Sequence, residues 1–284
     1  MSLVLDCQTP LRAAHTTAPD GYRLTYRTWR PEGPTRGTVV LLNGIMSHSA
    51  WFFPLVDALV AGGLAVVGAD RRGSGLNDEA RGDAPSAKAV IDDALAVIDA
   101  QAPSGPLYLV GWCWGSVLAL NLVRALGDRL TGFVMVAPGL FPSEAVQTAS
   151  VRHEADAADA AESDAAILTP IVDTMFTSGP YLEGFIRLDE RRLMHITPRF
   201  RALMSKLSMG ALARLRRLAA PLLVLLAEDD EATDNAAVLR AIGVLDEAQV
   251  TVRKATSGHA MQFDVPEFVT SQILAFAADA SPKA

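Results

Sequence analysis

The chain has 284 residues, of which 50% are hydrophobic and 20% are charged. This is enough for one large domain or two small ones, and it excludes a disordered chain, a collagen-like fibre and a disulfide scaffold. The 25 basic and 32 acidic residues give a net charge of −7, so no basic excess exists to neutralise phosphates, and no nucleic-acid partner is predicted. The short basic clusters at 71–72, 191–192 and 214–217 are expected on helix or loop surfaces.

The hydropathy pattern predicts no membrane-spanning helix. The longest apolar runs, at 39–42 and 222–227, are strand-sized, whereas a spanning helix needs roughly 20 residues. The N-terminus has neither the basic region nor the long apolar core of a signal peptide. Cys7 and Cys113 are too few for a disulfide framework; they could pair with each other, but two free thiols in a cytoplasmic protein are expected. Clustered histidines, C-x-x-C spacing and glycine-rich phosphate-binding motifs do not occur in the sequence, so neither a metal nor a cofactor is predicted.

Short apolar runs alternate with helical patterns along most of the chain. In chain order, the patterns predict a strand at 22–29, a strand at 38–42, a helix at 51–61, a strand at 64–69, a helix at 86–100, a strand at 107–110, a helix at 116–126 and a strand at 132–136. They resume with a strand at 221–227, a helix at 235–242, a strand at 249–253 and a helix at 266–278. Apolar strands in this rhythm predict an α/β fold, with a mostly parallel sheet covered by helices on both faces.

The strand rhythm stops between residues 140 and 219, where roughly 80 residues show helical periodicity. An all-helical insertion of this kind predicts a cap over the edge at which the strands end. The predicted domains are therefore a core of residues 1–140 and 220–284 and a cap of residues 141–219. In this cap, Met175 and Phe176 are expected to line an apolar path to the site, with packing in the cap's own core as the alternative.

The strongest local motif is Gly111-Trp112-Cys113-Trp114-Gly115, where a predicted strand runs directly into a predicted helix. Glycines two residues before and after the central residue allow the close backbone packing of a nucleophile elbow. The N-terminus of the following helix favours a thiolate at Cys113. The alternative is a small buried cysteine without chemistry.

With this motif, the chain resembles the α/β-hydrolase superfamily, and within it the monoglyceride lipase and lysophospholipase-like branch with serine aminopeptidases of the S33 type. The resemblance extends over nearly the whole chain, through Asp20-Gly21-Tyr22-Arg23-Leu24, Leu42-Asn43-Gly44-Ile45, Asp70-Arg71-Arg72-Gly73-Ser74-Gly75 and Val136-Ala137-Pro138-Gly139. It implies an α/β-hydrolase fold with a helical cap after the sixth strand. The Asp70 loop is expected to be architectural, tying strand and loop backbones together.

The cysteine departs from the lipases, whose elbow is Gly-x-Ser-x-Gly. Cysteine recurs at this position in dienelactone hydrolases and polyhydroxyalkanoate synthases of the same superfamily. An engineered replacement of a natural serine by Cys113 stays open as an alternative.

A nucleophile needs a base, and His259 follows the last predicted strand in a loop that can reach the elbow. The superfamily's acid position is best matched by Asp230, which would hold the imidazole in the correct tautomer. Asp229 and Asp234 are alternatives, and Asp234 could equally cap the helix that starts at residue 235. Three other histidines are expected to be solvated or packing residues, one before the domain and two in the cap: His15, His153 and His195.

The resemblance implies an oxyanion hole made by the backbone N–H groups of Ile45 and Trp114. Asn43 replaces the family's usual histidine before the loop glycine, which leaves the hydrogen bonds that support the loop open. Trp112 is expected to wall an acyl pocket or to pack in the core. His48 is expected to support the site or to contact the substrate.

Cysteine shifts the preferred chemistry towards thioesters, because the attacking and leaving sulfur atoms are then matched. The sequence therefore predicts an enzyme, a hydrolase of an ester, thioester or lactone that acts through an acyl-cysteine intermediate and a Cys-His-Asp triad. The alternatives are an acyltransferase that uses an amine, alcohol or thiol acceptor, and a catalytically silent binding protein. The expected partner is a small acyl substrate, including a carrier- or CoA-linked thioester, and the expected state is a monomer or homodimer.

Overall fold

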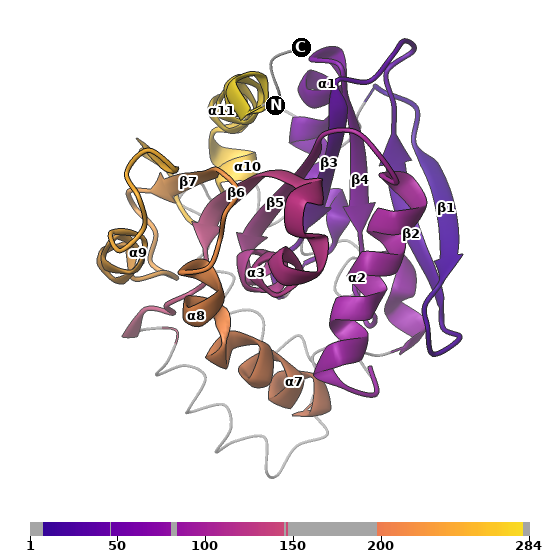
Figure 1. The fold of residues 1–284 in the computed structure, drawn as a ribbon, viewed down its shortest axis with the longest axis horizontal. Coiled ribbons are helices and arrows are strands. Elements are labelled where there is room, and N and C mark those ends of the chain that lie inside the picture. Colours follow the sequence, from indigo (N-terminus) through magenta and orange to yellow (C-terminus); the bar gives the residue numbers. More distant parts are fainter. Residues whose placement is uncertain (1–7, 46, 81–83, 145, 147–197, 281–284) are drawn as a thin grey trace.

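The computed structural model describes residues 8–45, 47–80, 84–144, 146 and 198–280 (Figure 1). Its centre is an eight-stranded sheet in the order β1-β2-β4-β3-β5-β6-β7-β8. The strands are β1 (Arg12–Thr17), β2 (Arg23–Trp29), β3 (Gly37–Leu42), β4 (Leu64–Ala69), β5 (Leu107–Cys113), β6 (Leu130–Pro138), β7 (Leu222–Ala227) and β8 (Val250–Ala255). β1 and β2 pair antiparallel, as do β2 and β4, and all other pairs are parallel. The predicted α/β-hydrolase fold is confirmed.

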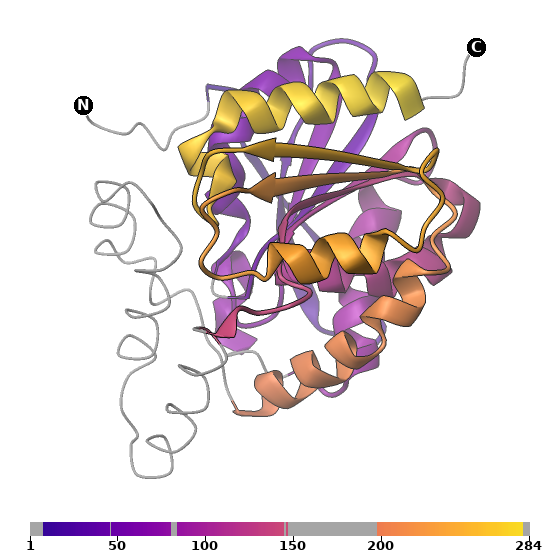
Figure 2. The ribbon, with the colours of Figure 1, turned by 90° about the vertical axis from the view of Figure 1, so that its left-hand side faces the viewer.

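The helices cover both faces of the sheet, as Figure 2 shows in side view. One face carries α2 (Ala87–Gln101), α3 (Trp114–Leu126), α7 (Pro198–Met209), α8 (Ala211–Leu215) and α9 (Asn235–Ile242). The other face carries η1 (Ser49–Phe52), α1 (Phe53–Ala61), α10 (Met261–Asp264) and α11 (Pro266–Ala280). Two short 3-10 helices, η2 (Gly75–Ala80) and η3 (Gly127–Arg129), complete the described elements. Because apolar side chains pack on both faces, every residue of β3, β4 and β7 is buried.

Most predicted strands and helices coincide with observed ones to within a few residues, and β4 and α9 coincide at both ends. The first strand was not predicted. His15 lies in β1, where it is opposite Thr25 of β2, so the expectation that His15 precedes the domain is wrong. β1 is an edge strand with no fully buried residue, so no apolar pattern marks it in the sequence. Its place in the sheet depends on backbone pairing with β2.

The basic pair Arg71-Arg72 was expected at the surface and is instead buried, with 7% and 6% of each residue exposed. Arg72 donates to both carboxylate oxygens of Asp93 at 2.7 Å and to Asp20 at 2.8 Å. Its guanidinium also lies 4.3 Å from the centre of the Tyr22 ring. A buried charge needs such partners, so this arginine ties the hairpin of β1 and β2 to α2.

The loop after β4 is architectural, as predicted. Asp70 accepts hydrogen bonds from Arg27 at 2.5 Å, from the Ser49 amide at 2.6 Å and from the Leu76 amide at 3.0 Å. These donors come from β2, η1 and η2. The carboxylate therefore fixes the end of β4 against three other segments.

The predicted cap of residues 141–219 falls largely outside the described residues. Only its beginning and its end, with α7 and α8, are described. Met175, Phe176, His153 and His195 lie outside the described residues, as does Cys7. Within the described ranges, no helix has the length and apolar character required to cross a bilayer.

The carboxyl ends of the parallel strands lie along one edge of the sheet, where ligand sites of such folds form. Loops that leave this edge carry the chemistry-bearing residues. In order of the strands they follow, these residues are Asn43 after β3, Asp70 after β4, Cys113 at the end of β5, Gly139 after β6, Asp230 after β7 and His259 after β8.

Candidate active site

Cys113 stands at a turn with no intervening loop, because β5 ends at this residue and α3 begins at Trp114. Its backbone has φ 53° and ψ −126°, a strained conformation for a residue with a side chain. A Cβ at Gly111 would lie 2.6 Å from backbone atoms of Gly115 and Ser116. A Cβ at Gly115 would overlap the carbonyl of Leu42. Both glycines of the predicted elbow are therefore required by backbone packing.

The thiol is free and half-buried, and two glycines pack around it. A Cβ at Gly139 would lie 3.0 Å from the Cys113 sulfur and 3.0 Å from the amide nitrogen of Trp114. A Cβ at Gly44 would lie 3.2 Å from Cβ of Cys113. Glycine backbone thus borders the sulfur at Gly139 and the β-carbon of Cys113 at Gly44. The Trp114 amide belongs to the first turn of α3, where N–H groups lack helical partners.

His259 and Asp230 form a fully buried pair, with 0% of either side chain exposed. Nδ1 of His259 lies 2.9 Å and 3.0 Å from the two carboxylate oxygens of Asp230. Oδ1 of Asp230 also accepts from the amides of Ala232 at 2.8 Å and Thr233 at 3.0 Å. These amides fix the carboxylate, and the carboxylate in turn fixes the imidazole.

The two alternative acids lie elsewhere. Asp229 is exposed, and Asp234 caps α9 by accepting from the Ala237 amide at 2.9 Å. Of the three carboxylates considered, Asp230 is therefore the one in contact with His259. The loop that carries the histidine is held separately, because the amide of Gly258 donates to Asp264 at 2.8 Å.

The charge state of His259 is set by opposing effects. Burial alone lowers the pKa of an imidazole. In His259 the negative charges of Cys113 and Asp230 outweigh burial and raise the pKa from 6.5 to about 10. Cys113 raises the pKa of the ring by its charge and by a side-chain hydrogen-bond contact, although that contact to Nε2 falls outside ordinary hydrogen-bond geometry. These interactions favour the protonated form of the ring.

The loop after β3 is folded by its own side chains. Asn43 donates from Nδ2 to the carbonyls of Gly44 at 3.0 Å and Ser47 at 2.5 Å. The Ser47 hydroxyl also donates to the Gly44 carbonyl, at 3.1 Å, and Arg71 donates to the Ile45 carbonyl at 2.5 Å. Asn43 thus supplies loop-supporting hydrogen bonds at the position where the family has histidine. The role of the Ile45 and Trp114 amides as oxyanion donors stays a prediction.

Trp112 and His48, both expected near the substrate, are almost completely buried. Nε1 of Trp112 donates to the main-chain carbonyl of His259 at 2.8 Å. His48 accepts from the Ala50 amide at 3.3 Å through Nδ1 and caps η1. Both side chains are enclosed by protein in this structure, and their expected role in substrate binding stays a prediction.

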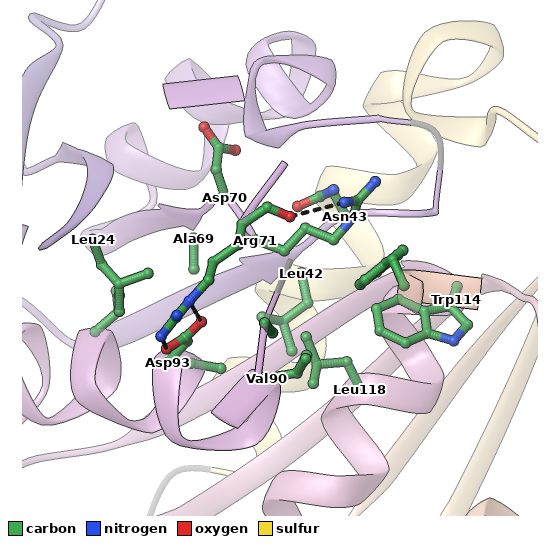
Figure 3. Close-up of a pocket in the computed structure, with 15 residues that line it drawn as sticks. Leu24, Leu42, Asn43, Ala69, Asp70, Arg71, Val90, Asp93, Trp114 and Leu118 are labelled. Carbon is green, nitrogen blue, oxygen red and sulfur yellow. Dashed lines mark hydrogen bonds and ion pairs between the residues drawn. The ribbon is translucent and has the colours of Figure 1, made fainter. Parts of the chain in front are cut away.

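A narrow cavity lies beside the loop after β3, between the sheet and helices α2, α3 and α7 (Figure 3). Its apolar wall includes Trp114, whose ring meets Phe200 of α7 edge to face at 5.8 Å. Arg71 also lines it, and its guanidinium lies 4.2 Å from the centre of the Phe200 ring. Burial lowers the pKa of Arg71 to about 9, although the nearby Asp70 opposes this. Cys113 is not among the lining residues.

Sequence reasoning missed Arg71 and Phe200 as neighbours of the site. The position of Arg71 just after β4, at the carboxyl edge of the sheet, was the available signal. Phe200 had no comparable signal, because it approaches Trp114 only through tertiary packing. Among the described residues, no group of three or more His, Cys, Asp or Glu side chains could hold a metal ion.

The profile of the serine aminopeptidase S33 family matches residues 33–262. The chain therefore belongs to this family of α/β-hydrolases.

Curated relatives match only part of the chain. It is 29% identical to phospholipase YtpA of Bacillus subtilis over 115 residues, which are 40% of this chain and 44% of the relative. It is 28% identical to a monoacylglycerol lipase of Mycolicibacterium smegmatis over 125 residues, 43% of each protein. The chain thus spans less than half the length of these relatives.

Among solved structures, a soluble variant of monoglyceride lipase from Saccharomyces cerevisiae superimposes with a TM-score of 0.78. The match covers 98% of both chains at 16% identity. At this identity the likeness shows the shared fold.

Proposed function

We propose that the protein is an acyl hydrolase in which Cys113 is the nucleophile, His259 the proton carrier and Asp230 the residue that orients His259. One observation carries the proposal: the thiol at the strained elbow interacts with a fully buried histidine whose Nδ1 is bound to a carboxylate. This is the arrangement of a nucleophile, a base and an orienting group.

In the first half-reaction, the Cys113 thiolate attacks the acyl carbon while His259 holds a proton on Nε2. The carbonyl oxygen becomes an oxyanion, for which the N–H groups of Ile45 and Trp114 are the expected donors. Collapse of the tetrahedral intermediate breaks the bond to the leaving group. The leaving sulfur or oxygen takes the proton from Nε2, and Cys113 is left as a thioester.

In the second half-reaction, His259 acts as a base. Cys113 carries no charge once it is acylated, so one of the interactions that raise the pKa of His259 is absent. Water gives a proton to Nε2 as its oxygen attacks the acyl carbon. The intermediate then collapses and releases a carboxylic acid, and the Cys113 thiolate and the imidazolium are restored.

A thioester is the preferred substrate, because its leaving thiolate is matched to Cys113 whereas an alkoxide leaves only with full protonation. The test pairs a short-chain thioester and an oxoester with the same acyl group, using the native protein, Cys113→Ser and Cys113→Ala. The native protein should favour the thioester, Cys113→Ser should shift towards the oxoester, and Cys113→Ala should be inactive. Turnover by Cys113→Ala at the native rate would refute the proposal.

Acyl transfer is the second candidate, because the half-buried acyl-cysteine would itself be a thioester that reacts readily with amines and thiols. Adding an amine or a thiol to the same assay separates the two outcomes. Hydrolysis predicts free acid as the main product at any practical acceptor concentration. Transfer predicts that the acylated acceptor replaces the acid.

A further inference from the structure

Trp112 contacts parts of the site that come from separate elements. It directly precedes Cys113 in β5, and only 1% of it is exposed. Its Nε1 donates to the carbonyl of His259 at 2.8 Å. A Cβ at Gly44 would lie 3.0 Å from Cζ3 of its ring, so the backbone of the loop after β3 runs directly against the indole. One side chain therefore touches the loop that carries His259 and the loop after β3 that carries the expected oxyanion donor Ile45 (the oxyanion loop), and it directly precedes the nucleophile in the chain.

The Trp112 ring also faces the imidazole. The two ring centres are 5.5 Å apart, with 45° between the planes. Trp51 stacks on Trp112 with centres 5.4 Å apart and 28° between the planes, and Phe263 meets Trp51 edge to face at 5.8 Å. An indole within about 6 Å of a cation attracts it, most strongly where water is excluded. The fixed indole therefore favours the charged ring of His259.

We propose that Trp112 is a positioning residue that keeps His259 and the oxyanion loop aligned with Cys113 and stabilises His259 as an imidazolium. This inference rests on the proposed function, since it concerns the base of the same reaction. Among the described residues, the charged groups that act on His259 are Cys113 at the elbow and Asp230 in the loop after β7. Asp264 lies close along the chain and binds the Gly258 amide. A substitution of Trp112 leaves all of these groups in the chain.

The test compares Trp112→Phe with Trp29→Phe as a matched control. Trp29 is also 1% exposed, it packs edge to face against Phe53 at 5.7 Å, and its Nε1 has no hydrogen-bond partner among the described residues. Both substitutions remove the same atoms from the core, so their thermal unfolding midpoints measure the structural cost. Only Trp112→Phe removes the hydrogen bond to His259.

Two readouts go beyond stability: the pH dependence of Cys113 alkylation by iodoacetamide, and the separate kcat and KM for a short-chain acyl thioester. Trp112→Phe should shift the onset of alkylation upward by about one pH unit and lower kcat about tenfold or more, with little change in KM. Trp29→Phe should change neither. Equal changes in both variants would overturn the inference, because they would show a purely structural role.

A measurement on the unsubstituted chain covers the case in which Trp112→Phe does not fold. The chain has four tryptophans, and labelling with 5-fluorotryptophan gives each a fluorine resonance. A resonance should titrate together with His259 in the native protein, and its shift should vanish in His259→Gln. No titrating resonance would overturn the inference. A titrating resonance in a protein that forms no acyl adduct would instead contradict the proposed function and leave the Trp112 contact supported.

Discussion

The substitution Asp230→Asn isolates the contribution of the buried carboxylate. Asparagine is nearly the same size, and its oxygen can still accept from the amides of Ala232 and Thr233, which now bond to Oδ1. Its NH₂ group would then face Nδ1 of His259. The neutral imidazole would then carry its proton on Nε2, and this nitrogen could not accept a proton from water. We therefore expect a folded protein with an impaired base.

The size of the loss follows from the burial of the pair. Both side chains are 0% exposed and in contact at 2.9 Å. Because water cannot replace the carboxylate in this buried contact, the loss should approach that of the same substitution in a serine-protease triad, about 10⁴-fold in kcat or about 5–6 kcal/mol in activation free energy. The substitution should therefore lower kcat/KM on the order of 10³–10⁴-fold. Without the Asp230 charge the pKa of His259 should also fall, since that charge helps to raise it to about 10.

The assay is steady-state hydrolysis of a short-chain acyl thioester, beside Asp229→Asn and Asp234→Asn. These controls change the same loop by the same atoms. Asp229 is exposed, and asparagine at 234 keeps a side chain suited to cap α9. Both should retain activity within a few-fold of native. A loss below tenfold in Asp230→Asn, or an equal loss in either control, would show that Asp230 does not orient His259 for catalysis.

Four further outcomes follow from the described contacts. Arg72→Met leaves Asp93 buried without its partner and should lower the unfolding free energy by about 3–5 kcal/mol in urea titrations; a change under 1 kcal/mol would contradict this. Asn43→Asp cannot donate to the loop carbonyls and should lower kcat at least tenfold with little change in KM, whereas unchanged kcat would show that these bonds do not matter. Gly139→Ala places a methyl group 3.0 Å from the thiol sulfur and should slow alkylation of that thiol; native alkylation rates would argue against this packing. The folded-state pKa of His259 is raised to about 10, so the contribution of this histidine to stability is complete below about pH 6.5 and is lost as the pH rises through about 10. The unfolding free energy, measured by chemical denaturation across this range, should decline less in His259→Gln than in the native protein. Equal declines in the two proteins would refute the raised pKa.

Several features of the fold are visible in the sequence because their causes are local. The apolar run at 64–69 predicts a buried parallel strand, and β4 has these bounds. The helix at 235–242 is predicted with the same bounds, and its cap by Asp234 was one of the roles considered for that residue. The elbow is also a local feature, because Gly111 and Gly115 on either side of Cys113 are the residues that the close backbone packing requires.

Other features depend on partners that are distant in the chain. Arg72 is buried because it meets Asp93, 21 residues away, and Asp20, 52 residues away. β1 is half-exposed and forms through pairing with β2. No local sequence pattern predicts either arrangement.

The choice among the candidate acids depends on the turn after β7. In that turn Asp230 accepts from the amides two and three residues ahead, and it meets His259 only once β7 and β8 are adjacent. The sheet face on which Trp112 lies, in contrast, can be predicted from the sequence. Strand alternation places it on the same sheet face as Tyr108 and Val110, within the core layer that holds α1 and α11.

Covalent catalysis by Cys113 can be observed by intact mass spectrometry of the native protein with a short-chain acyl thioester, quenched in acid, beside Cys113→Ala and His259→Ala. We expect one acyl adduct on the native chain, none in Cys113→Ala and much slower formation in His259→Ala. Turnover of the thioester with no adduct on the native chain, or the same adduct in Cys113→Ala, would show that Cys113 is not the nucleophile. Neither adduct nor turnover with thioesters or activated esters would refute acyl transfer through Cys113, and ligand binding would then be the next hypothesis to test.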